Sequence, residues 1–476
     1  MKLSKRNILS AISISFMFFL LSAPSFAIEE ITENSEVSLS DCIDYALSHN
    51  HAIKIYDERV QMAKNNVGLA KSSYFPTVGA SGGYSYDYRT SRRVSDSSNS
   101  FNAGVGIRQL IYSFGKVLSS VKMQKLDLIA AQYDYDDVVI ATVNNVKKNY
   151  YAVIAAEANL EVQVANVQIN ERQYERTKAF FDEGLVSKID VVNQEVYLSE
   201  AKIQLLNADK AYKLAFSALN KSMSFDNAPN YTLSYPDNFK ESRDYIRSKL
   251  SKIGTNTTAA DGTEKTPDNV LTTQVEKVDM LQGFQFKPFD KTLEECIDIA
   301  FKQRPDYLAV KAAQDYAEEY IKYTKRSYLP DLTGSASYNF ANSQNYNTNS
   351  FGIGVDLVSS NLNFMEINLR IKQAEAELEI AKQTTQYTEE DVYFSVEESY
   401  ITLIEQEKKI PLLQEKVLQT LENYELADAR YDVGLGNFIE LQDAKVNYNN
   451  AQQAYIQAVH NYNEALVSLQ SAMGEK

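Results

Sequence analysis

The two halves of the sequence repeat each other, and this internal repeat limits what the chain can fold into more than any other feature. The segment SLSDCIDYALSHNHAI, which starts at Ser38, matches TLEECIDIAFKQRPDY, which starts at Thr292, at an offset of 254 residues. Further along, the segments that contain Gly184 and Gly434 match at an offset of 250 residues. We therefore expect one order of elements to occur twice: a helix, two strands, a very long helix, a glycine turn and a long return helix.

The repeat also divides the chain into four parts. Residues 1–27 have a basic start, an apolar run and a small-residue cleavage site, which predicts a signal peptide. The first repeat then occupies residues 28–223, and the second occupies residues 292–476. Between them, residues 224–291 form a connector that is expected to be partly disordered, because its middle is poor in apolar residues, with one short helix at 239–254.

Composition and charge exclude several kinds of protein. Glycine and proline are scarce, with 17 and 9 residues, while there are 32 tyrosines, which favours long helices with many aromatic side chains. The net charge of −15 argues against a nucleic-acid partner, because nothing offsets phosphate repulsion. After the signal segment, no apolar run in the sequence is long enough for a transmembrane helix.

The residue patterns predict neither an enzyme nor a metal or cofactor site. Cys42 and Cys296 occupy equivalent repeat positions, so we expect two buried small side chains rather than a disulfide. The three histidines and these two cysteines lack metal-ligand spacing. The sequence also contains no nucleophile–base set and no phosphate-binding loop.

Four segments alternate between apolar and polar residues with the period of a β-strand. Their apolar or aromatic positions include Val78, Ala80, Gly82, Tyr84, Tyr86, Tyr88, Phe101, Ala103, Val105, Ile107, Leu332, Gly334, Ala336, Tyr338, Phe340, Phe351, Ile353, Val355 and Leu357. This pattern is typical of membrane β-barrel strands, although a soluble hairpin with one wet face has it too. The polar segments Arg89–Ser100 and Ala341–Ser350 are expected to be loops, and the four residues missing from the second copy are expected to come from a loop.

Four strands cannot close a barrel around water, so a channel requires several copies of the chain. Three copies would supply twelve strands, an even number that suits antiparallel closure. The export signal favours this membrane interpretation over the soluble hairpin.

Two very long helices are predicted at Gly115–Phe180 and Met365–Asp432, the second interrupted at Pro411. About 65 residues at 1.5 Å per residue give a rod of about 100 Å. Apolar residues recur at spacings of three and four, as in coiled coils, and the return helices Ile189–Leu219 and Phe438–Met473 are rich in alanine. A soluble coiled-coil bundle would show the same periodicity.

These elements in this order, after a signal peptide, resemble the outer membrane efflux protein family, the TolC-like exit ducts. The resemblance is carried by CIDYAL and CIDIAF, the strand starts Tyr74-Phe75-Pro76 and Tyr328-Leu329-Pro330, QLIYSFGK, FFDEGLVSKIDVVNQE and RYDVGLGNFIELQDAK. It implies a mixed α and β membrane protein of the cell outer membrane. In such a protein, a homotrimeric twelve-stranded β-barrel, with four strands per chain, continues into an α-helical coiled-coil tunnel in the periplasm.

The resemblance also implies partners and a function. We expect a passive channel of a tripartite efflux pump, which conducts small molecules exported by an inner-membrane transporter of the RND or ABC class through a periplasmic adaptor (membrane fusion) protein. The same body could serve as the outer membrane duct of a type I protein secretion system. An alternative of another class is a soluble periplasmic coiled-coil scaffold, whereas a hydrolase that uses Glu440 and Asp443 would lack a pocket.

Glu440 and Asp443 are three residues apart and share a helix face. The resemblance implies that they form acidic rings that constrict the periplasmic entrance. Glu440 follows Asn437 by three residues, so a helix capping box explains it as well, and a solvated helix face is the alternative for Asp443. By the same resemblance, Tyr431 helps to hold the entrance shut and Asp190 is its acidic partner from the first repeat.

The resemblance also assigns the helical tips to adaptor docking, although plain helix C-caps explain the same residues. The tip residues are Gly184, Leu185, Val433, Gly434 and Leu435. The family pattern has an arginine where this chain has Gly436. We therefore expect a closed state that is looser or differently braced.

Overall fold

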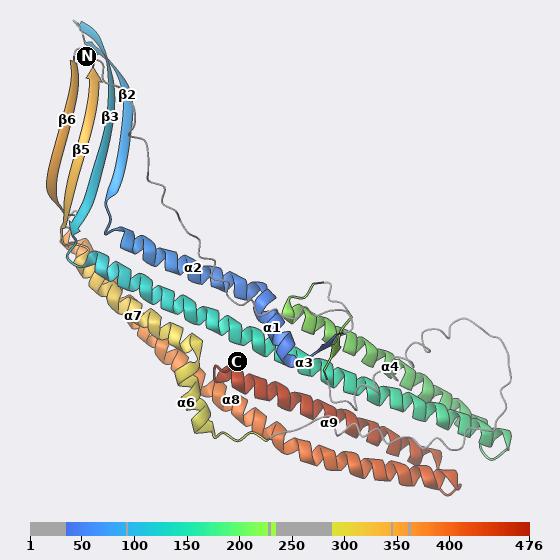
Figure 1. Cartoon of the computed structure of the whole chain (residues 1–476). Helices are drawn as coiled ribbons and strands as arrows, with labels where there is room; N and C mark the ends of the chain where they lie inside the picture. The colour runs from blue at the N-terminus through green and yellow to red at the C-terminus, as the bar shows by residue number, and fades with distance from the viewer. Residues whose placement is uncertain (1–34, 92–93, 227–229, 235–287, 344–345, 360–362) are drawn as a thin grey trace, which may run out of the picture.

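Both repeats fold into the predicted order of elements in the computed structural model, which describes residues 35–91, 94–226, 230–234, 288–343, 346–359 and 363–476 (Figure 1). The first repeat contains α1 (Leu39–His49), α2 (His51–Ser72), β2 (Thr77–Ser91), β3 (Val94–Tyr112), α3 (Lys116–Asp182) and α4 (Lys188–Met223). The second contains α6 (Leu293–Gln303), α7 (Pro305–Arg326), β5 (Asp331–Ser343), β6 (Tyr346–Val358), α8 (Phe364–Asp432) and α9 (Phe438–Ala472). Two short strands, β1 (Glu36–Val37) and β4 (Thr232–Leu233), pair in parallel.

Three predictions fall where the structure gives no description. The signal peptide at 1–27, the short helix at 239–254 and the greater part of the 224–291 connector lie outside the described residues. They stay predictions from the sequence.

The opening helix of each repeat is broken in two, which the sequence prediction missed. In the first repeat Asn50 has an extended backbone (ψ 125°), and its side chain accepts a hydrogen bond from Ala52 N at 2.8 Å to start α2. In the second repeat Pro305 takes the first position of α7. A residue before proline is disfavoured in the helical conformation, so Arg304 breaks the helix there.

The four long strands form one antiparallel sheet in the order β2-β3-β5-β6. Its hairpins extend beyond the predicted strands, because Arg89 pairs with Asp96 and Asn342 pairs with Asn347. The prediction of loops at Arg89–Ser100 and Ala341–Ser350 was therefore wrong. Backbone hydrogen bonds continue a β-ladder even where the side chains of both faces are polar.

The length difference between the two repeats also lies in the strands rather than in a loop. β2 has 15 residues and β5 has 13. β3 begins at Val94, seven residues before Phe101, whereas β6 begins at Tyr346, five before the equivalent Phe351. Two residues are thus missing from each strand of the second hairpin, at the end near its turn.

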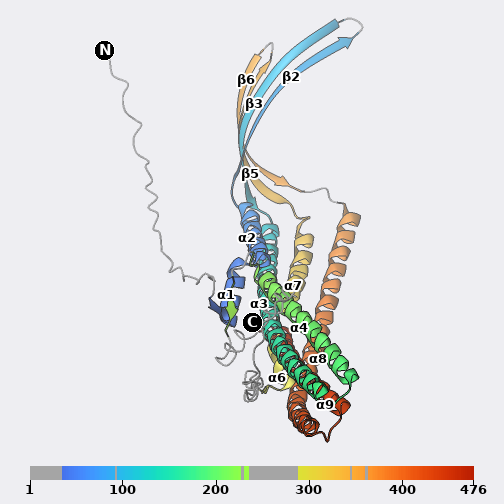
Figure 2. The same ribbon diagram turned by 90° about the vertical axis from the view of Figure 1, so that its right-hand side faces the viewer.

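The register of the sheet confirms the predicted alternation of side chains. One row across one face consists of Ala80, Val105, Tyr338 and Phe351. The neighbouring row of the opposite face consists of Gly79, Gly106, Ser337 and Gly352. One face is therefore apolar and aromatic while the other is small and polar, and the sheet projects beyond the helices (Figure 2).

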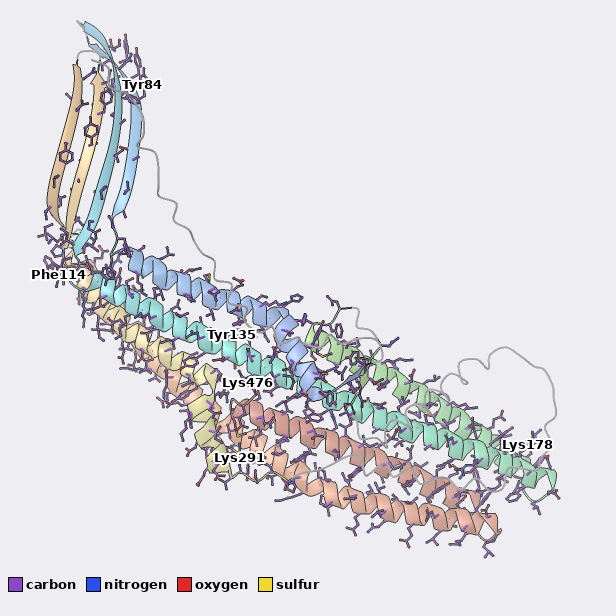
Figure 3. The ribbon with its side chains drawn as sticks, in the orientation of Figure 1. Tyr84, Phe114, Tyr135, Lys178, Lys291 and Lys476 are labelled. Carbon is purple, nitrogen blue, oxygen red and sulfur yellow. The ribbon has the colours of Figure 1, made fainter. Side chains whose placement is uncertain are left out.

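The long helices α3 and α8 have 67 and 69 residues, so each is a rod of about 100 Å. Pro411 lies inside α8 without ending it, contrary to the expected interruption, and the neighbouring Ile410 is buried in the apolar core. We attribute the continuity of α8 to this packing. Figure 3 shows the two ends of the molecule, with Tyr84 on the sheet and Lys178 close to the far ends of the helices.

The core is a seam between paired helices rather than a compact centre. On α9 and α4 the seam contains buried alanines at seven-residue spacing: Ala444, Ala451, Ala458, Ala465 and Ala472, with Ala201 and Ala208. This spacing is the coiled-coil repeat that the sequence predicted. Cys42 and Cys296 are free and completely buried in two separate apolar clusters, which confirms that they form no disulfide.

At each level the molecule is a wall four elements wide. Next to the sheet, α2 contacts α3, α3 contacts α7, and α7 contacts α8. Farther from the sheet, α4 contacts α3, α3 contacts α9, and α9 contacts α8. At every level, one free edge is formed by the first repeat and the other by the second (Figure 1).

Candidate functional site

The helix ends farthest from the sheet contain the predicted site residues, and both turns have the predicted form. Gly434 has a left-handed backbone (φ 72°), and Leu435 N donates to Arg430 O at 2.9 Å. Gly184 has the same conformation (φ 75°), and Leu185 N donates to Phe180 O at 2.8 Å. The glycines are needed because other residues rarely adopt this backbone conformation.

Apolar side chains project into solvent from both turns. Val433 and Leu435 are 69% and 77% exposed, and Leu185 is 72% exposed. Exposed apolar side chains at a helix turn are free to contact a partner. The structure thus places Gly184, Leu185, Val433, Gly434 and Leu435 at the two tips, where the sequence predicted them.

The second tip forms only half of the expected capping box. Asn437 Oδ1 accepts a hydrogen bond from Glu440 N at 2.8 Å, as predicted. The Glu440 carboxylate instead forms an ion pair with Arg430, with 3.0 Å between Oε1 and NH1. In the first repeat Ser187 and Asp190 form the capping box, and the Asp190 carboxylate is engaged in it: its Oδ2 accepts from Ser187 N at 3.0 Å and from Ser187 Oγ at 2.7 Å.

The predicted gate residues occupy different environments in the single chain. Asp443 is exposed, and Glu440 is partly exposed on the same helix. Tyr431 is buried, with its ring against Phe180, and its hydroxyl has no hydrogen-bond partner among the described residues. The structure does not join Asp190 to Tyr431 by a hydrogen bond within one chain.

Gly436 lies very close to the backbone of Arg430 and Tyr431 in the preceding helix end. A Cβ atom at Gly436 would lie 3.0 Å from Tyr431 N and 3.2 Å from the Arg430 carbonyl carbon, and Gly436 N donates to Arg430 O at 2.9 Å. A larger residue would therefore require the turn to shift. In this chain the arginine of the turn is Arg430, which binds Glu440.

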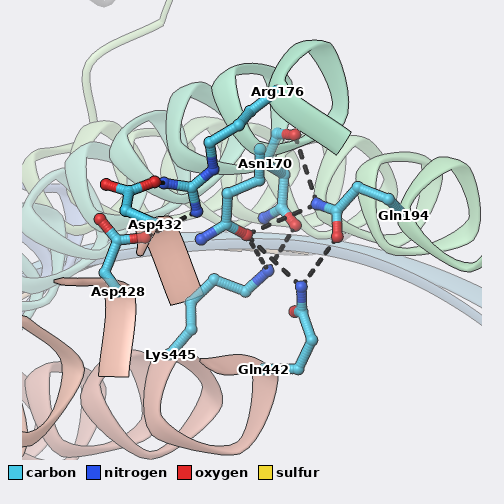
Figure 4. A network of polar contacts seen from close by, with 8 residues as sticks. Asn170, Arg176, Gln194, Asp428, Asp432, Gln442 and Lys445 are labelled. Carbon is cyan, nitrogen blue, oxygen red and sulfur yellow. Dashed lines mark hydrogen bonds and ion pairs between the residues drawn. The ribbon is translucent and has the colours of Figure 1, made fainter. Parts of the chain in front are cut away.

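Sequence reasoning missed an ion-pair cluster that joins the repeats near these tips. Arg176 on α3 binds Asp428, with 2.8 Å between NH2 and Oδ1, and also binds Asp432, both on α8 (Figure 4). The guanidinium also lies over the Tyr431 ring, 5.2 Å from its centroid. Burial opposes the charge of Arg176, but the neighbouring carboxylates raise its pKa above the ordinary value.

Sequence reasoning also missed a buried lysine beside this cluster. Lys445 on α9 is 4% exposed, and its Nζ lies 2.7 Å from Asn170 Oδ1 and 3.1 Å from Gln173 Oε1, both on α3 (Figure 4). Gln442 Nε2 donates to Gln194 Oε1 of α4 at 2.8 Å. Burial lowers the pKa of Lys445 to about 7.

One signal for this buried polar group was present in the sequence. Gln194 occupies the repeat position of Ala444, in a row where the following seam positions are the alanines Ala201 and Ala208. A glutamine at a seam position predicts a polar contact inside the coiled coil. Its partner on α9 could not be named from the sequence.

The described residues lack two further features. They do not bring three His, Cys, Asp or Glu side chains together as a metal site. Within the described ranges, no helix has both the length and the apolar character needed to cross a membrane.

A model of the outer membrane efflux protein family matches residues 42–224 and 296–475. Outer membrane protein TolC of Vibrio cholerae is 26% identical over 208 residues, which cover 43% of this chain and 47% of that protein. The alkaline protease secretion protein AprF of Pseudomonas aeruginosa is 23% identical over 183 residues, 37% of each chain. The matched segment thus spans less than half the length of these relatives.

Solved structures share the fold over nearly the whole chain. The CmeC outer membrane channel of Campylobacter jejuni superposes with a TM-score of 0.71 at 18% sequence identity, covering 92% of this chain and 85% of that one. The likeness extends to both repeats and to the sheet as well as the helices.

Proposed function

The chain belongs to the outer membrane efflux protein family, and from this premise we propose that it is the outer membrane channel of a tripartite efflux pump. It is an outer membrane protein whose long helices lie in the periplasm. In this proposal it passively conducts small molecules that an inner-membrane transporter of the RND or ABC class delivers through a periplasmic adaptor. Outer membrane lipid surrounds the sheet, and the energy comes from the transporter.

The observation that carries the proposal is the pair of free edges at every level of the four-element wall. A wall with two free edges leaves strand hydrogen bonds and helix faces unpaired. The first repeat forms one edge of the wall and the second repeat forms the other. The first-repeat edge of one chain can therefore pack against the second-repeat edge of the next chain, in a head-to-tail arrangement. Three copies close a ring of twelve strands and twelve helices per level, which is the predicted homotrimer.

The edge helices have the side chains that such a joint needs. Each has apolar residues that are more than half exposed at seven-residue spacing: Ile55, Met62 and Leu69 on α2, Ile189, Val196 and Ile203 on α4, and Ile380, Tyr387, Phe394 and Ile401 on α8. Seven-residue spacing is the contact repeat of coiled coils. In the proposed ring, α2 and α4 of one chain pack on α8 of the next.

We propose that Glu440 and Asp443 gate the entrance, with Tyr431 and Asp190 as supporting residues. Three chains would place Glu440 and Asp443 in two acidic rings near the tips. Rings of like charge attract cations, which would then obstruct the channel. The exposure of Asp443 and the incomplete cap at Glu440 support this role. The exposed tips at Leu185, Val433 and Leu435 would receive the adaptor.

The gate is tested in planar bilayers with purified protein. Glu440→Ala with Asp443→Ala should raise single-channel conductance and weaken block by divalent cations. Arg430→Ala is the matched control, because it frees Glu440 from its ion pair and should strengthen the block. If conductance and block are unchanged in the double variant, Glu440 acts only as a helix cap and Asp443 only as a surface charge. If wild-type protein forms no channels, the proposed function is rejected.

The protein-secretion duct is the second candidate, and the similarity to the secretion protein AprF favours it. A deletion strain distinguishes the two. Loss of this chain should raise sensitivity to small toxic compounds if it serves efflux, whereas it should remove a protein from the culture medium if it serves secretion. The outer membrane location argues against a soluble scaffold.

A further inference from the structure

Lys445 has an unusual position, because it is a buried cation whose hydrogen-bond partners are neutral. Among the described residues its ammonium contacts only the amide oxygens of Asn170 and Gln173, with the Tyr197 ring centroid 5.5 Å away. The amide groups that surround it are themselves buried: Asn170, Gln173, Gln194 and Gln442 are each 5% exposed or less. Together with Lys445 we call these four residues the amide cage.

The amide cage joins two hairpins that belong to different repeats. Asn170 and Gln173 lie on α3 and Gln194 lies on α4, whereas Gln442 and Lys445 lie on α9. Three side-chain hydrogen bonds of 3.1 Å or less cross from α9 to the first hairpin. Any movement that separates α3–α4 from α8–α9 near the tips must break them and expose Lys445 to water.

The cage is also imperfectly satisfied. Gln442 Oε1 is buried without a hydrogen-bond partner in the described part of the chain. A buried polar group without a partner costs free energy, so it lowers the free energy needed to separate the hairpins. The contact is therefore weaker than a fully hydrogen-bonded cage would be.

The neighbouring charges do not neutralise Lys445. On α3, Arg176 is a second cation, and it already binds two carboxylates of α8, those of Asp428 and Asp432. On α8, burial raises the pKa of the Tyr424 hydroxyl to about 12, so this group stays neutral. On α4, the group that faces Nζ is the Tyr197 ring.

The acids of α9 itself are engaged elsewhere. Glu440 binds Arg430, and Asp443 is exposed to solvent. Asp190 at the start of α4 is held by Ser187. None of the described carboxylates forms an ion pair with Lys445, so only the amide dipoles and the face of the Tyr197 ring compensate its charge.

We propose that the amide cage is a proton-dependent clasp that holds the two hairpins of each chain together when Lys445 is neutral and loosens when Lys445 binds a proton. The ligand of this site is the proton itself. A buried ammonium without a counter-ion loses its hydration, whereas water solvates it once the hairpins separate. Protonation therefore favours separation, and loss of the proton favours the closed arrangement.

The sign of the pH dependence follows from two pKa values. Burial lowers the pKa of Lys445 to about 7 in the closed hairpins, and its ordinary pKa of 10.5 applies once it is exposed. Between these values the separated state binds one more proton, so the ratio of separated to closed hairpins rises up to tenfold for each pH unit that the pH falls. Below about pH 7 both states are protonated and the dependence ends.

The test measures the distance between the two tips in the full-length purified protein. Leu185→Cys and Leu435→Cys accept spin labels in a chain whose native cysteines are alanine. Co-expression with an excess of unlabelled chain leaves most assemblies with one labelled chain. The urea concentration at which the distance lengthens is then recorded at pH 7.0, 8.0 and 9.5.

Wild type should need more urea as the pH rises over this range, whereas Lys445→Gln and Lys445→Met should show one value throughout. Lys213→Gln, at an exposed lysine of α4, is the control and should behave as wild type. A wild-type midpoint that does not change with pH, or an equal rise in Lys445→Gln, would overturn the proposal.

The link between the clasp and channel opening rests on the proposed function, but the distance measurement does not. It needs no membrane, current or partner. A protein without conductance would defeat the proposed channel and leave the clasp standing, whereas a pH-independent tip distance in a conducting protein would defeat the clasp alone.

Discussion

Glu319 joins the two repeats close to the sheet through a buried carboxylate. It lies on α7, and it accepts hydrogen bonds from Ser119 Oγ at 2.8 Å and from Lys122 Nζ at 2.9 Å, both on α3. Lys322 of its own helix adds a third contact at 3.2 Å. Burial would raise the pKa of Glu319, but these hydrogen bonds outweigh it and hold the pKa at about 2.

The Glu319 pKa predicts an acid-sensitive stability. The ordinary pKa of 4.5 is higher than the folded value of about 2, so the ionised carboxylate stabilises the fold above pH 4.5. That contribution, roughly 3 kcal/mol, is lost as the pH falls through this interval. Glu319→Gln should therefore unfold at a lower temperature at pH 7 and lose less stability than wild type between pH 5 and pH 3, as followed by circular dichroism.

The adjacent Glu318 provides the control for this prediction, because its side chain is exposed. Glu318→Gln should reproduce the wild-type curve at every pH. A Glu319→Gln curve that runs parallel to wild type over the acid range would show that the hydrogen bonds of Glu319 do not depend on its charge.

Residues of this kind mark the limit of prediction from the sequence. Glu319, Arg176 and Lys445 each occur in a helical pattern of mixed charge, where a solvated face is the simplest interpretation. Their partners lie about 200 to 280 residues away, on the other repeat. Which charges meet depends on how each helix rotates about its axis, and no local spacing records that rotation.

At the scale of elements, prediction succeeded where a physical pattern extends over many residues. The long helices, the glycine turns and the alternating strands each follow from such a pattern. The predictions that were wrong concern the ends of the strands and the breaks in the opening helices. The break between α1 and α2 at Asn50 depends on one side-chain cap. The outer ends of the strands depend on backbone hydrogen bonds, which the side-chain pattern does not reveal.

The alanine seam predicts a sharp size limit at the contact of α8 with α9. Ala451 is completely buried in the core cluster of the second repeat. Ala451→Leu adds three carbons to a packed interface, so it should lower the free energy of unfolding by about 1–3 kcal/mol. Ala211→Leu, at an exposed position of α4, is the control and should change stability little. Equal urea midpoints for both variants would show that the seam is loosely packed.

At the scale of the whole molecule, the repeat explains why the chain is open at both edges. Duplication of a two-element unit gives a wall four elements wide at each level, with a different repeat at each end. Within one chain α3 and α9 lie between α4 and α8 (Figure 1). Contact between α4 and α8 is therefore a measure of assembly.

This separation gives a direct test of the proposed ring. Val192 lies four residues after Lys188, the first residue of α4, and Leu426 lies six residues before Asp432, the last residue of α8, so they are about 6 Å and about 9 Å from their helix ends, and both are exposed. In a head-to-tail trimer, Val192→Cys with Leu426→Cys should form disulfides between chains, and denaturing gels should show covalent trimers without reducing agent.

The second pair, Val196→Cys with Leu426→Cys, tests the same contact in case α4 is shifted by one helical turn along α8 of the neighbouring chain. The background lacks Cys42 and Cys296, and either new cysteine alone should leave monomers on the gel. Covalent trimers from one of the two pairs would place α4 of each chain against α8 of the next, as the free apolar edges require. Monomers from both pairs, in protein that still migrates as an oligomer before denaturation, would mean that the chains join through other faces.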